Sequence, residues 1–230
     1  MRTLFYLFAF IILFYSCTNR QNETPMKTTQ PTESYTLSLA DFNWIHPPKK
    51  SEIIGTDTLI IHTDPQTDYW QRTYYGFQND NAHTFVREIE GDFSFSVKTD
   101  FESKNLFDQC GIVMYQDSEN WVKASIEFEN EQHSRLGSVV TNLGYSDWAT
   151  TDISTSTYSM WYRLSRRGAD FYIENSLDGE NWLQMRVLHM HIPIHKARVG
   201  VYACSPVGAD MKAVFSGFKL EPSQWKAHGE

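Results

Sequence analysis

The chain has 230 residues, a formal net charge of −8 and no long run of lysine or arginine. Because phosphate binding requires a basic face, this charge balance argues against a nucleic-acid partner. Aromatic residues make up 15% of the chain, including 7 Trp and 12 Tyr, which favours a β-sandwich with aromatic-lined surfaces over a helical bundle.

The first residues carry the pattern of a secretory signal. Arg2 precedes an apolar run over residues 4–15, which is too short to span a bilayer comfortably. Residues 13–17 read LFYSC and resemble a bacterial lipobox, in which a small residue precedes the cysteine that receives lipid. We therefore predict a lipoprotein signal peptide over residues 1–16 and lipidation at Cys17. The alternative is an ordinary cleaved signal followed by a chance cysteine.

A polar segment rich in Thr, Asn, Gln and Pro follows Cys17. Such a segment cannot bury enough apolar surface to fold, so residues 17–36 are predicted to form a flexible tether. The expected location is the bacterial cell envelope, with the membrane as a partner through the lipid anchor and the protein facing the periplasm or the surface. The folded domain is predicted over residues 37–222, with a C-terminal tail over 223–230.

Beyond the tether, short alternating segments are separated by Gly, Asn, Asp and Pro, and none shows a helical period over ten residues. The strongest turn signal is Asp178-Gly179, which lies between two strand-like runs. The pattern predicts one all-β domain, a sandwich with the topology of a jelly roll. Its predicted strands are Thr58–Thr63, Thr84–Ile89, Asp92–Glu102, Gly111–Gln116, Asn120–Glu129, Gly137–Thr141, Met160–Arg166, Asp170–Ser176, Trp182–Leu188, Arg198–Ala203 and Ala213–Leu220.

The segment WVKASIEFE, residues 121–129, has the most informative alternation. One face carries Val122, Ala124, Ile126 and Phe128, and the other carries Trp121, Lys123, Ser125, Glu127 and Glu129. The second face combines an indole, an ammonium and carboxylates, which is the composition of a sheet that contacts sugar. We interpret Glu129 and the following Glu131 as the solvated end of the strand.

Nine short pieces of the chain, in order, resemble the DUF1349 family, also called the regulation-of-enolase-protein-1-like family, over Asp41 to Leu220. The pieces are Asp68-Tyr69-Trp70, Gly91-Asp92-Phe93, Asp108-Gln109-Cys110-Gly111, Trp121-Val122-Lys123 with Glu127, Ser138-Val139-Val140-Thr141-Asn142, Ser146-Asp147-Trp148, Trp161-Tyr162-Arg163, Ser176-Leu177-Asp178-Gly179 and Cys204-Ser205-Pro206. The resemblance implies a concanavalin A-like jelly roll of two antiparallel sheets. It implies no established activity, and an association with carbohydrate is inferred from sandwich relatives.

These observations predict a carbohydrate-binding surface without catalysis of its own, in a protein accessory to glycan utilisation. Loops at the ends of strands carry binding residues more often than core strands do, so residues near strand ends join those of the 121–129 face. The expected ligand-binding residues are Trp70, Asp108, Gln109, Trp121, Lys123, Glu127, Asn142, Asp147 and Trp148. Two alternatives stay open: a glycan-active hydrolase or lyase that uses Glu127 with Asp108 or Lys123, and a structural or interaction lipoprotein with no small ligand.

No cofactor or metal site is expected. His189, His191 and His195 form the only histidine cluster, and they lack a nearby set of acidic ligands. No phosphate-binding loop, dinucleotide fingerprint or nucleophile elbow occurs. The envelope would permit a disulfide between Cys110 and Cys204, but two buried, unpaired thiols are the preferred interpretation.

Overall fold

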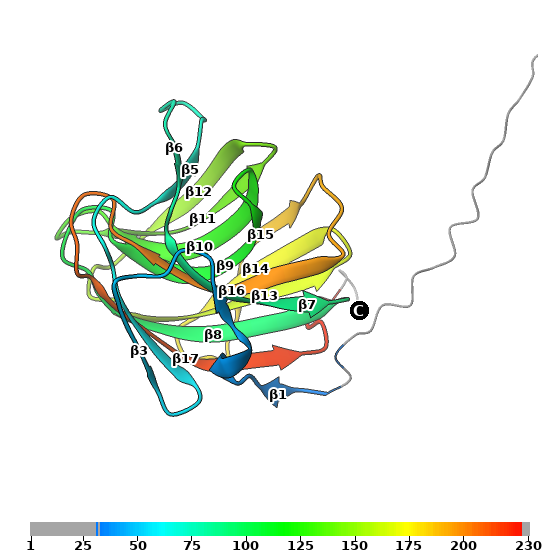
Figure 1. Cartoon of the computed structure of the whole chain (residues 1–230). Coiled ribbons are helices and arrows are strands. Elements are labelled where there is room, and N and C mark those ends of the chain that lie inside the picture. The colour runs from blue at the N-terminus through cyan, green and yellow to red at the C-terminus, as the bar shows by residue number, and fades with distance from the viewer. Residues whose placement is uncertain (1–30, 32, 227–230) are drawn as a thin grey trace, which may run out of the picture.

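The computed structural model describes residue 31 and residues 33–226, which form two antiparallel sheets packed face to face (Figure 1). Sheet A has the order β15 (Leu183–His189), β14 (Asp170–Ser176), β13 (Ser159–Arg167), β8 (Phe93–Glu102), β17 (Lys212–Glu221), β4 (Thr58–His62) and β3 (Lys50–Ile54), with β1 (Tyr35–Thr36) paired to β17. Sheet B has the order β12 (Tyr145–Ile153), β11 (Ser134–Asn142), β10 (Asn120–Phe128), β9 (Gln109–Asp117), β16 (Lys196–Cys204), β7 (His83–Glu90) and β2 (Asn43–Trp44). A separate hairpin joins β5 (Tyr69–Gln71) to β6 (Gln78–Asp80), and one short 3₁₀ helix, η1 (Leu39–Asp41), precedes β2.

The predicted all-β jelly-roll sandwich is confirmed, and all eleven predicted strands are present as β4, β7–β11 and β13–β17. The Asp178-Gly179 turn joins β14 to β15, and Gly179 has a φ of +78°, a conformation that glycine adopts without a steric penalty.

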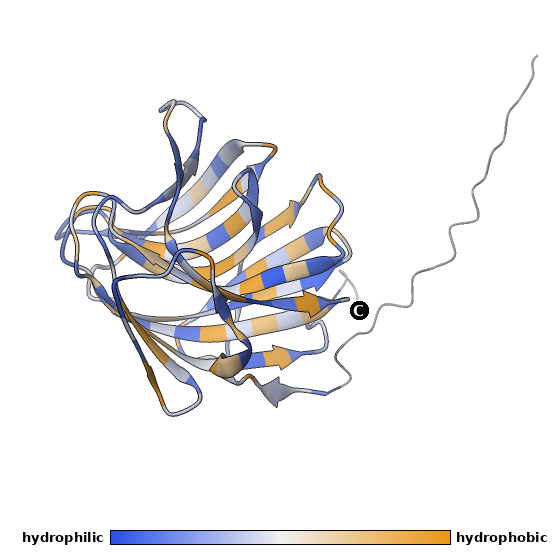
Figure 2. Cartoon of the chain, viewed as in Figure 1, coloured by the Kyte–Doolittle hydropathy of each residue, from blue (hydrophilic) through white to orange (hydrophobic). Residues whose placement is uncertain are grey.

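The main core lies between the two sheets and is built from the inward-facing positions of each strand. In β8, Phe93, Phe95 and Val97 are fully buried, and the alternation of apolar and polar residues is visible along the strands in Figure 2. Burying a side chain of this size contributes about 1.5–3 kcal/mol relative to leaving it exposed. The alternation therefore specifies both the strand and the face by which it packs.

The β10 strand lies inside sheet B, between β11 and β9, and separates two apolar clusters. Val122, Ala124 and Ile126 point into the main core, as their alternation predicts. The opposite face of sheet B, which we call the outer face, carries a second cluster formed by Tyr69, Ala82, Val86, Val113, Tyr115, Trp121, Val139, Tyr202 and Cys204. The outer face is thus covered in part by the chain itself.

Six strands were not predicted, namely β1, β2, β3, β5, β6 and β12. Tyr35 and Thr36 of β1 pair with Leu220 and Lys219, so the folded domain begins before residue 37 and the end of the predicted tether belongs to sheet A. The β12 strand forms the edge of sheet B, and seven of its nine residues are exposed. An edge strand without a buried face lacks the apolar alternation by which strands are predicted.

Cys110 and Cys204 are both buried free thiols, as the sequence analysis predicted in preference to a disulfide. They lie on neighbouring strands, where Cys110 is opposite Ala203, so Cys204 is one residue further along and points to the other face. Cys110 belongs to the main core and Cys204 to the outer cluster, and burial raises the pKa of both thiols.

The predicted signal peptide, Cys17 and most of the predicted tether lie outside the described residues, as do the last four residues of the predicted tail. Within residues 31 and 33–226, no helix is long and apolar enough to cross a membrane.

Candidate functional site

A pocket of about 410 Å³ lies on the outer face of sheet B, beside the β5–β6 hairpin that projects at the top of Figure 1. Sheet B supplies the floor, the hairpin supplies one wall, and the loops that precede β9 and follow β16 supply the other. The lining residues are Asp68, Tyr69, Trp70, Tyr75, Phe77, Asn79, Phe107, Gln109, Lys123, Glu127, Val139, Trp148, Pro206 and Val207. This set brings together Trp70, Gln109, Lys123, Glu127 and Trp148 of the predicted binding residues.

The hairpin wall is aromatic and internally ordered. Trp70 donates its indole N–H to the carbonyl of Thr73 at 3.0 Å, which fixes the ring against the turn. Tyr75 packs edge-on against Trp70, with ring centroids 5.4 Å apart, and stacks on Phe77 at 5.4 Å and 15°. Three rings therefore hold one another in place along the side of the pocket.

Contacts to sheet B hold the hairpin in position. The backbone N–H of Gln71 donates to Ser146 Oγ at 2.9 Å, and the Arg72 guanidinium donates to the carbonyl of Gly144 at 2.8 Å. At the other strand, the Tyr115 hydroxyl donates to Asp80 at 2.9 Å. Because both strands are tied to the sheet, the wall exists before a ligand arrives.

Trp148 lies on the floor of the pocket, on β12. Its strand pairs with β11 so that Val139 faces Trp148 and Gly137 faces Thr150. A Cβ atom added at Gly137 would lie 3.0 Å from the indole nitrogen of Trp148, so the ring passes over bare backbone there. The residue is 37% exposed, which leaves part of the indole available to a ligand.

Gln109 organises the polar part of the floor and is itself fully engaged. Its Oε1 accepts hydrogen bonds from Lys123 Nζ and from the Tyr202 hydroxyl, each at 2.9 Å. Its Nε2 donates to Glu127 Oε2 at 2.6 Å. Gln109 therefore lines the pocket, as predicted, and its amide also orients the two charged side chains.

Lys123 is only 4% exposed, yet its ammonium lines the pocket. It lies 3.8 Å from Asp68 Oδ1 and 5.3 Å from the centre of the Tyr202 ring. Asp68 is held in turn by the backbone N–H of Tyr69, which donates to Oδ1 at 2.7 Å. The buried positive charge is therefore compensated by a fixed carboxylate and an aromatic face.

Glu127 lines the pocket beside this ion pair. Burial of its carboxyl raises the pKa of Glu127 to about 7, although the Lys123 ammonium and the hydrogen bond from Gln109 act in the opposite direction. Its Oε1 has no hydrogen-bond partner among the described residues, whereas Oε2 accepts from Gln109. The pocket thus contains a carboxyl group that changes charge near neutral pH and has one oxygen left for a ligand.

Two predicted binding residues are buried away from the pocket. Trp121 is fully buried in the outer cluster, where its ring lies 5.2 Å from that of Tyr69, so the prediction that Trp121 binds the ligand is wrong. Asp108 is also fully buried and caps a turn. Its carboxylate accepts from the backbone N–H groups of Lys104 and Asn105 at 2.8 Å and from Ser205 Oγ at 2.5 Å. Those contacts exclude Asp108 as a catalytic partner of Glu127.

Asn142 and Asp147 have structural partners in the segment that includes β15. Asn142 donates to the carbonyl of His189 and accepts from the N–H of His191, both at 3.0 Å. Asp147 pairs with Arg186 at 2.6 Å. Asp147 is one residue from Trp148 on β12, so its side chain points to the opposite face of the strand. Neither residue lines the pocket.

No group of three or more His, Cys, Asp or Glu side chains among the described residues is arranged to hold a metal ion. Of the histidine cluster, His189 pairs with Asp170 at 2.6 Å and its ring lies 5.5 Å from that of His191.

Several pocket residues escaped prediction, above all Asp68, Tyr75, Phe77 and Phe107. The run from Asp68 to Phe77 does contain a visible signal, because it combines one carboxylate with five aromatic residues in a segment without strand alternation. Its position over β10 depends on contacts across distant parts of the chain, such as the hydrogen bond between Gln71 and Ser146.

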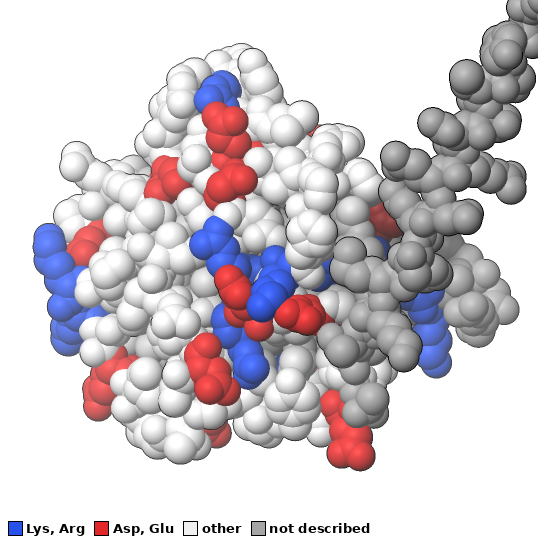
Figure 3. Space-filling model, turned by 45° about the vertical axis from the view of Figure 1, so that its right-hand side comes forward, with Lys and Arg blue, Asp and Glu red and all other residues white. Residues whose placement is uncertain are grey.

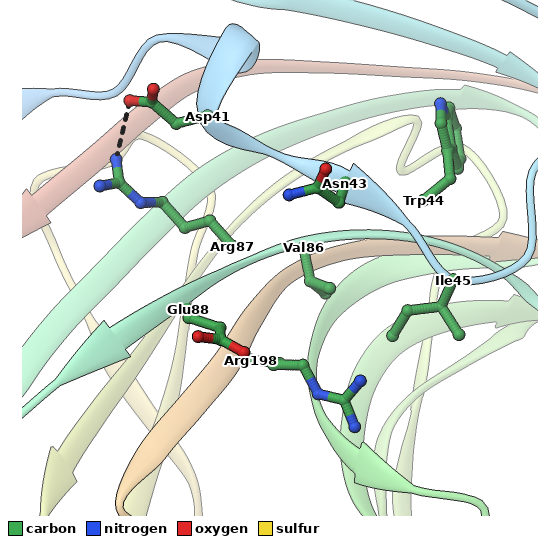
Figure 4. Close-up of a pocket in the computed structure, with 8 residues that line it drawn as sticks. All are labelled: Asp41, Asn43, Trp44, Ile45, Val86, Arg87, Glu88 and Arg198. Carbon is green, nitrogen blue, oxygen red and sulfur yellow. Dashed lines mark hydrogen bonds and ion pairs between the residues drawn. The ribbon is translucent and has the colours of Figure 1, made fainter.

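A second hollow of about 520 Å³ lies where β2 meets β7, and Figure 4 shows its lining. Arg87 in that hollow pairs with Asp41 at 3.4 Å, and Arg198 lies over the ring of Tyr115 at 5.4 Å. Figure 3 shows acidic and basic side chains intermixed on the face that it presents. This second hollow contains none of the predicted residues and carries charges that already have partners.

The fold and the pocket define a jelly-roll β-sandwich with an aromatic-walled, polar-floored pocket on the outer face of one sheet. The chain belongs to the family described as "Protein of unknown function (DUF1349)", whose family model matches residues 44–223. It is 32% identical over 195 residues to "Regulation of enolase protein 1" of Saccharomyces cerevisiae, covering 85% of this chain and 96% of the yeast protein.

Solved structures share the sandwich. A functionally unknown protein from Saccharomyces cerevisiae matches with a TM-score of 0.76 and 29% identity, over 82% of this chain and 100% of that one. The GH43 protein BlXynB from Bacillus licheniformis, in a K247S mutant, matches with a TM-score of 0.62 and 17% identity, over 83% of this chain but only 38% of that one. An engineered GH43 glycoside hydrolase gives a TM-score of 0.64 at 15% identity, over 84% of this chain and 41% of that one. The sandwich is therefore related in fold to parts of glycoside hydrolase structures.

Proposed function

We propose that this protein binds carbohydrate in the pocket on the outer face of sheet B, without catalysis of its own. The observation that carries the proposal is the half-exposed indole of Trp148, which lies across Gly137 next to the Lys123–Glu127 pair and opposite the aromatic hairpin wall. A sugar ring presents a C–H face that packs on an indole and a rim of hydroxyl groups that both donate and accept hydrogen bonds.

The two charged groups on the floor have complementary hydrogen-bonding roles. Lys123 can only donate, whereas an ionised Glu127 can only accept. Neighbouring sugar hydroxyls satisfy both groups at once, because each hydroxyl accepts through its oxygen and donates through its hydrogen. Because Gln109 fixes both side chains and the hairpin is tied to sheet B, these groups would lose little conformational freedom on binding.

A second candidate function, glycan hydrolysis, draws support from Glu127. A general acid works best when its pKa lies near the working pH, and the pKa of Glu127 is raised to about 7 by burial. With Asp108 engaged in a turn, Asp68 is the other carboxylate that lines the pocket. Lys123 forms an ion pair with Asp68 at 3.8 Å and is linked to Glu127 through the amide of Gln109. The third possibility, an interaction lipoprotein without a small ligand, has no feature of the pocket in its favour.

A broad glycan array, followed by calorimetry and product analysis, separates the three possibilities. We expect the purified protein to bind at least one class of oligosaccharide and to release no shorter products after prolonged incubation. Release of shorter sugars that Glu127→Gln abolishes would make the protein an enzyme. Failure to bind any glycan, with no glycan raising the melting temperature, would contradict the proposal.

We also propose that the domain is displayed at a bacterial cell envelope by lipid on Cys17, with the following polar segment as a spacer. This proposal rests on the signal-like residues 1–16 and the small residue before Cys17. Mass spectrometry of the mature N-terminal peptide should show a diacylglycerol-modified cysteine. An unmodified peptide that spans Ser16 to Thr18 in the mature protein would end the idea.

A further inference from the structure

We propose that the pocket selects uncharged sugar residues and rejects uronic acids. The inference rests on the proposed carbohydrate binding and goes further, because it names the class of glycan. It follows from the arrangement of Asp68, Lys123 and Glu127, which are the charged residues among those that line the pocket.

Lys123, the positively charged residue among those that line the pocket, already has partners. Lys123 donates to Gln109 Oε1 at 2.9 Å, lies 3.8 Å from Asp68 Oδ1 and faces the ring of Tyr202 at 5.3 Å. With 4% exposure, it cannot swing out to meet a ligand. A ligand carboxylate would therefore have to compete with Asp68 for an ammonium that is already neutralised.

A carboxylate that entered the pocket would also face two acidic groups. Asp68 is fixed by the N–H of Tyr69 at 2.7 Å, and Glu127 is fixed by Gln109 at 2.6 Å, so neither can turn away. Like charges in a poorly solvated pocket repel strongly, and each buried charge must be paired to be tolerated. A uronate would force protonation of a carboxyl group or leave an unpaired negative charge.

The remaining lining residues carry no positive charge that could pair with a ligand carboxylate. Trp70, Tyr75, Phe77, Phe107, Pro206 and Val207 form apolar walls. The Asn79 amide already donates to Asp68 at 3.4 Å, and no arginine is found among the described residues that line the pocket. Arginine is the side chain whose geometry best matches a carboxylate. A neutral sugar needs no positively charged partner, because its hydroxyls can pair with Lys123 and Glu127 and its C–H faces can pack on the aromatic rings.

The test uses oligosaccharide pairs that differ only in the oxidation state of C6. Uronic-acid oligosaccharides prepared from pectin, glucuronoxylan and alginate are each compared with their carboxyl-reduced counterparts, by calorimetry at pH 8 on the full chain. In every pair that binds, we expect the reduced, uncharged member to bind at least tenfold more tightly. An acidic member that binds as tightly as its reduced counterpart would overturn the inference and leave carbohydrate binding intact.

Charge removal supplies an independent readout. Glu127→Gln keeps the shape of the side chain and removes one of the two facing charges, so the preference for the uncharged member should shrink at least threefold. Asp68→Asn should reduce the preference in the same way. With two variants, one that folds correctly is enough to decide the test. An unchanged preference in the folded variants would show that these carboxylates do not set the selectivity. A complete lack of binding to both members of every pair, and to the array, would instead contradict the proposed function itself.

Discussion

Replacing Trp148 with alanine should weaken glycan binding by about 10- to 100-fold while the melting temperature of the domain changes little. Tryptophan is the side chain most often found to dominate a binding site, and truncation of such a residue costs about 2 kcal/mol or more. The indole is 37% exposed and lies on an edge strand, so its removal leaves no cavity in the main core. The expected loss of unfolding free energy is about 1 kcal/mol or less.

Calorimetry with a glycan selected from the array measures this effect, and the hairpin offers a matched pair for comparison. Tyr75→Ala should also weaken binding, because Tyr75 lines the pocket. Its neighbour Tyr74 is 93% exposed and does not line the pocket, so Tyr74→Ala should leave affinity within about twofold. If Trp148→Ala unfolds the domain and the folded remainder keeps its affinity, Trp148 is a structural residue and the proposed platform is misplaced.

The fold could be predicted largely because its central strands bury one face each. The alternation in β8 and β10 reports that burial directly, since Phe93, Phe95 and Val122 all reach the main core. Such a signal is absent where a strand is short or lies at an edge. The β5 and β6 strands have three residues each, and β12 is exposed along most of its length.

The candidate site could be predicted only in part, because alternation assigns a residue to a face but does not say what covers that face. Trp121, Lys123 and Glu127 do share the outer face of β10, as predicted. Trp121 is nevertheless buried under Tyr69 of the hairpin, whereas Glu127 lies further along the strand and borders the pocket. The difference depends on where the hairpin crosses the sheet, and local sequence pattern carries no information about that.

The roles of Asp108 and Gln109 illustrate the same limit at the level of single atoms. Both side chains can serve a ligand or the protein, and the choice depends on partners far away in the chain. Asp108 bonds to Ser205, and Gln109 bonds to Lys123 and to Tyr202. These partners come from strands or loops that are neighbours only in the folded sheet.

Substituting Glu127 with glutamine should stabilise the domain above neutral pH and have a much smaller effect near pH 4.5. Burial raises the pKa of Glu127 from an ordinary 4.5 to about 7, so between these pH values the folded protein holds a proton that the unfolded chain has lost. Stability therefore falls as the pH rises through this window, because the unfolded state binds fewer protons than the folded state. The loss approaches its full value about one unit above pH 7 and amounts to about 3 kcal/mol.

Glutamine does not titrate and can still accept the hydrogen bond from Gln109 Nε2 through its own carbonyl oxygen. Urea unfolding of both proteins between pH 4.5 and pH 8 should therefore show a stability difference that grows with pH by about 2–3 kcal/mol in favour of Glu127→Gln. The matched control is Glu129→Gln, two residues further along the chain, whose carboxylate pairs with Arg135 at 3.2 Å. Removing that partly exposed ion pair should cost about 0–1 kcal/mol, with little change across the same pH range. A pH-independent difference between Glu127→Gln and the unaltered protein would show that Glu127 is ionised in the folded state throughout, and would remove the main support for its use as a general acid.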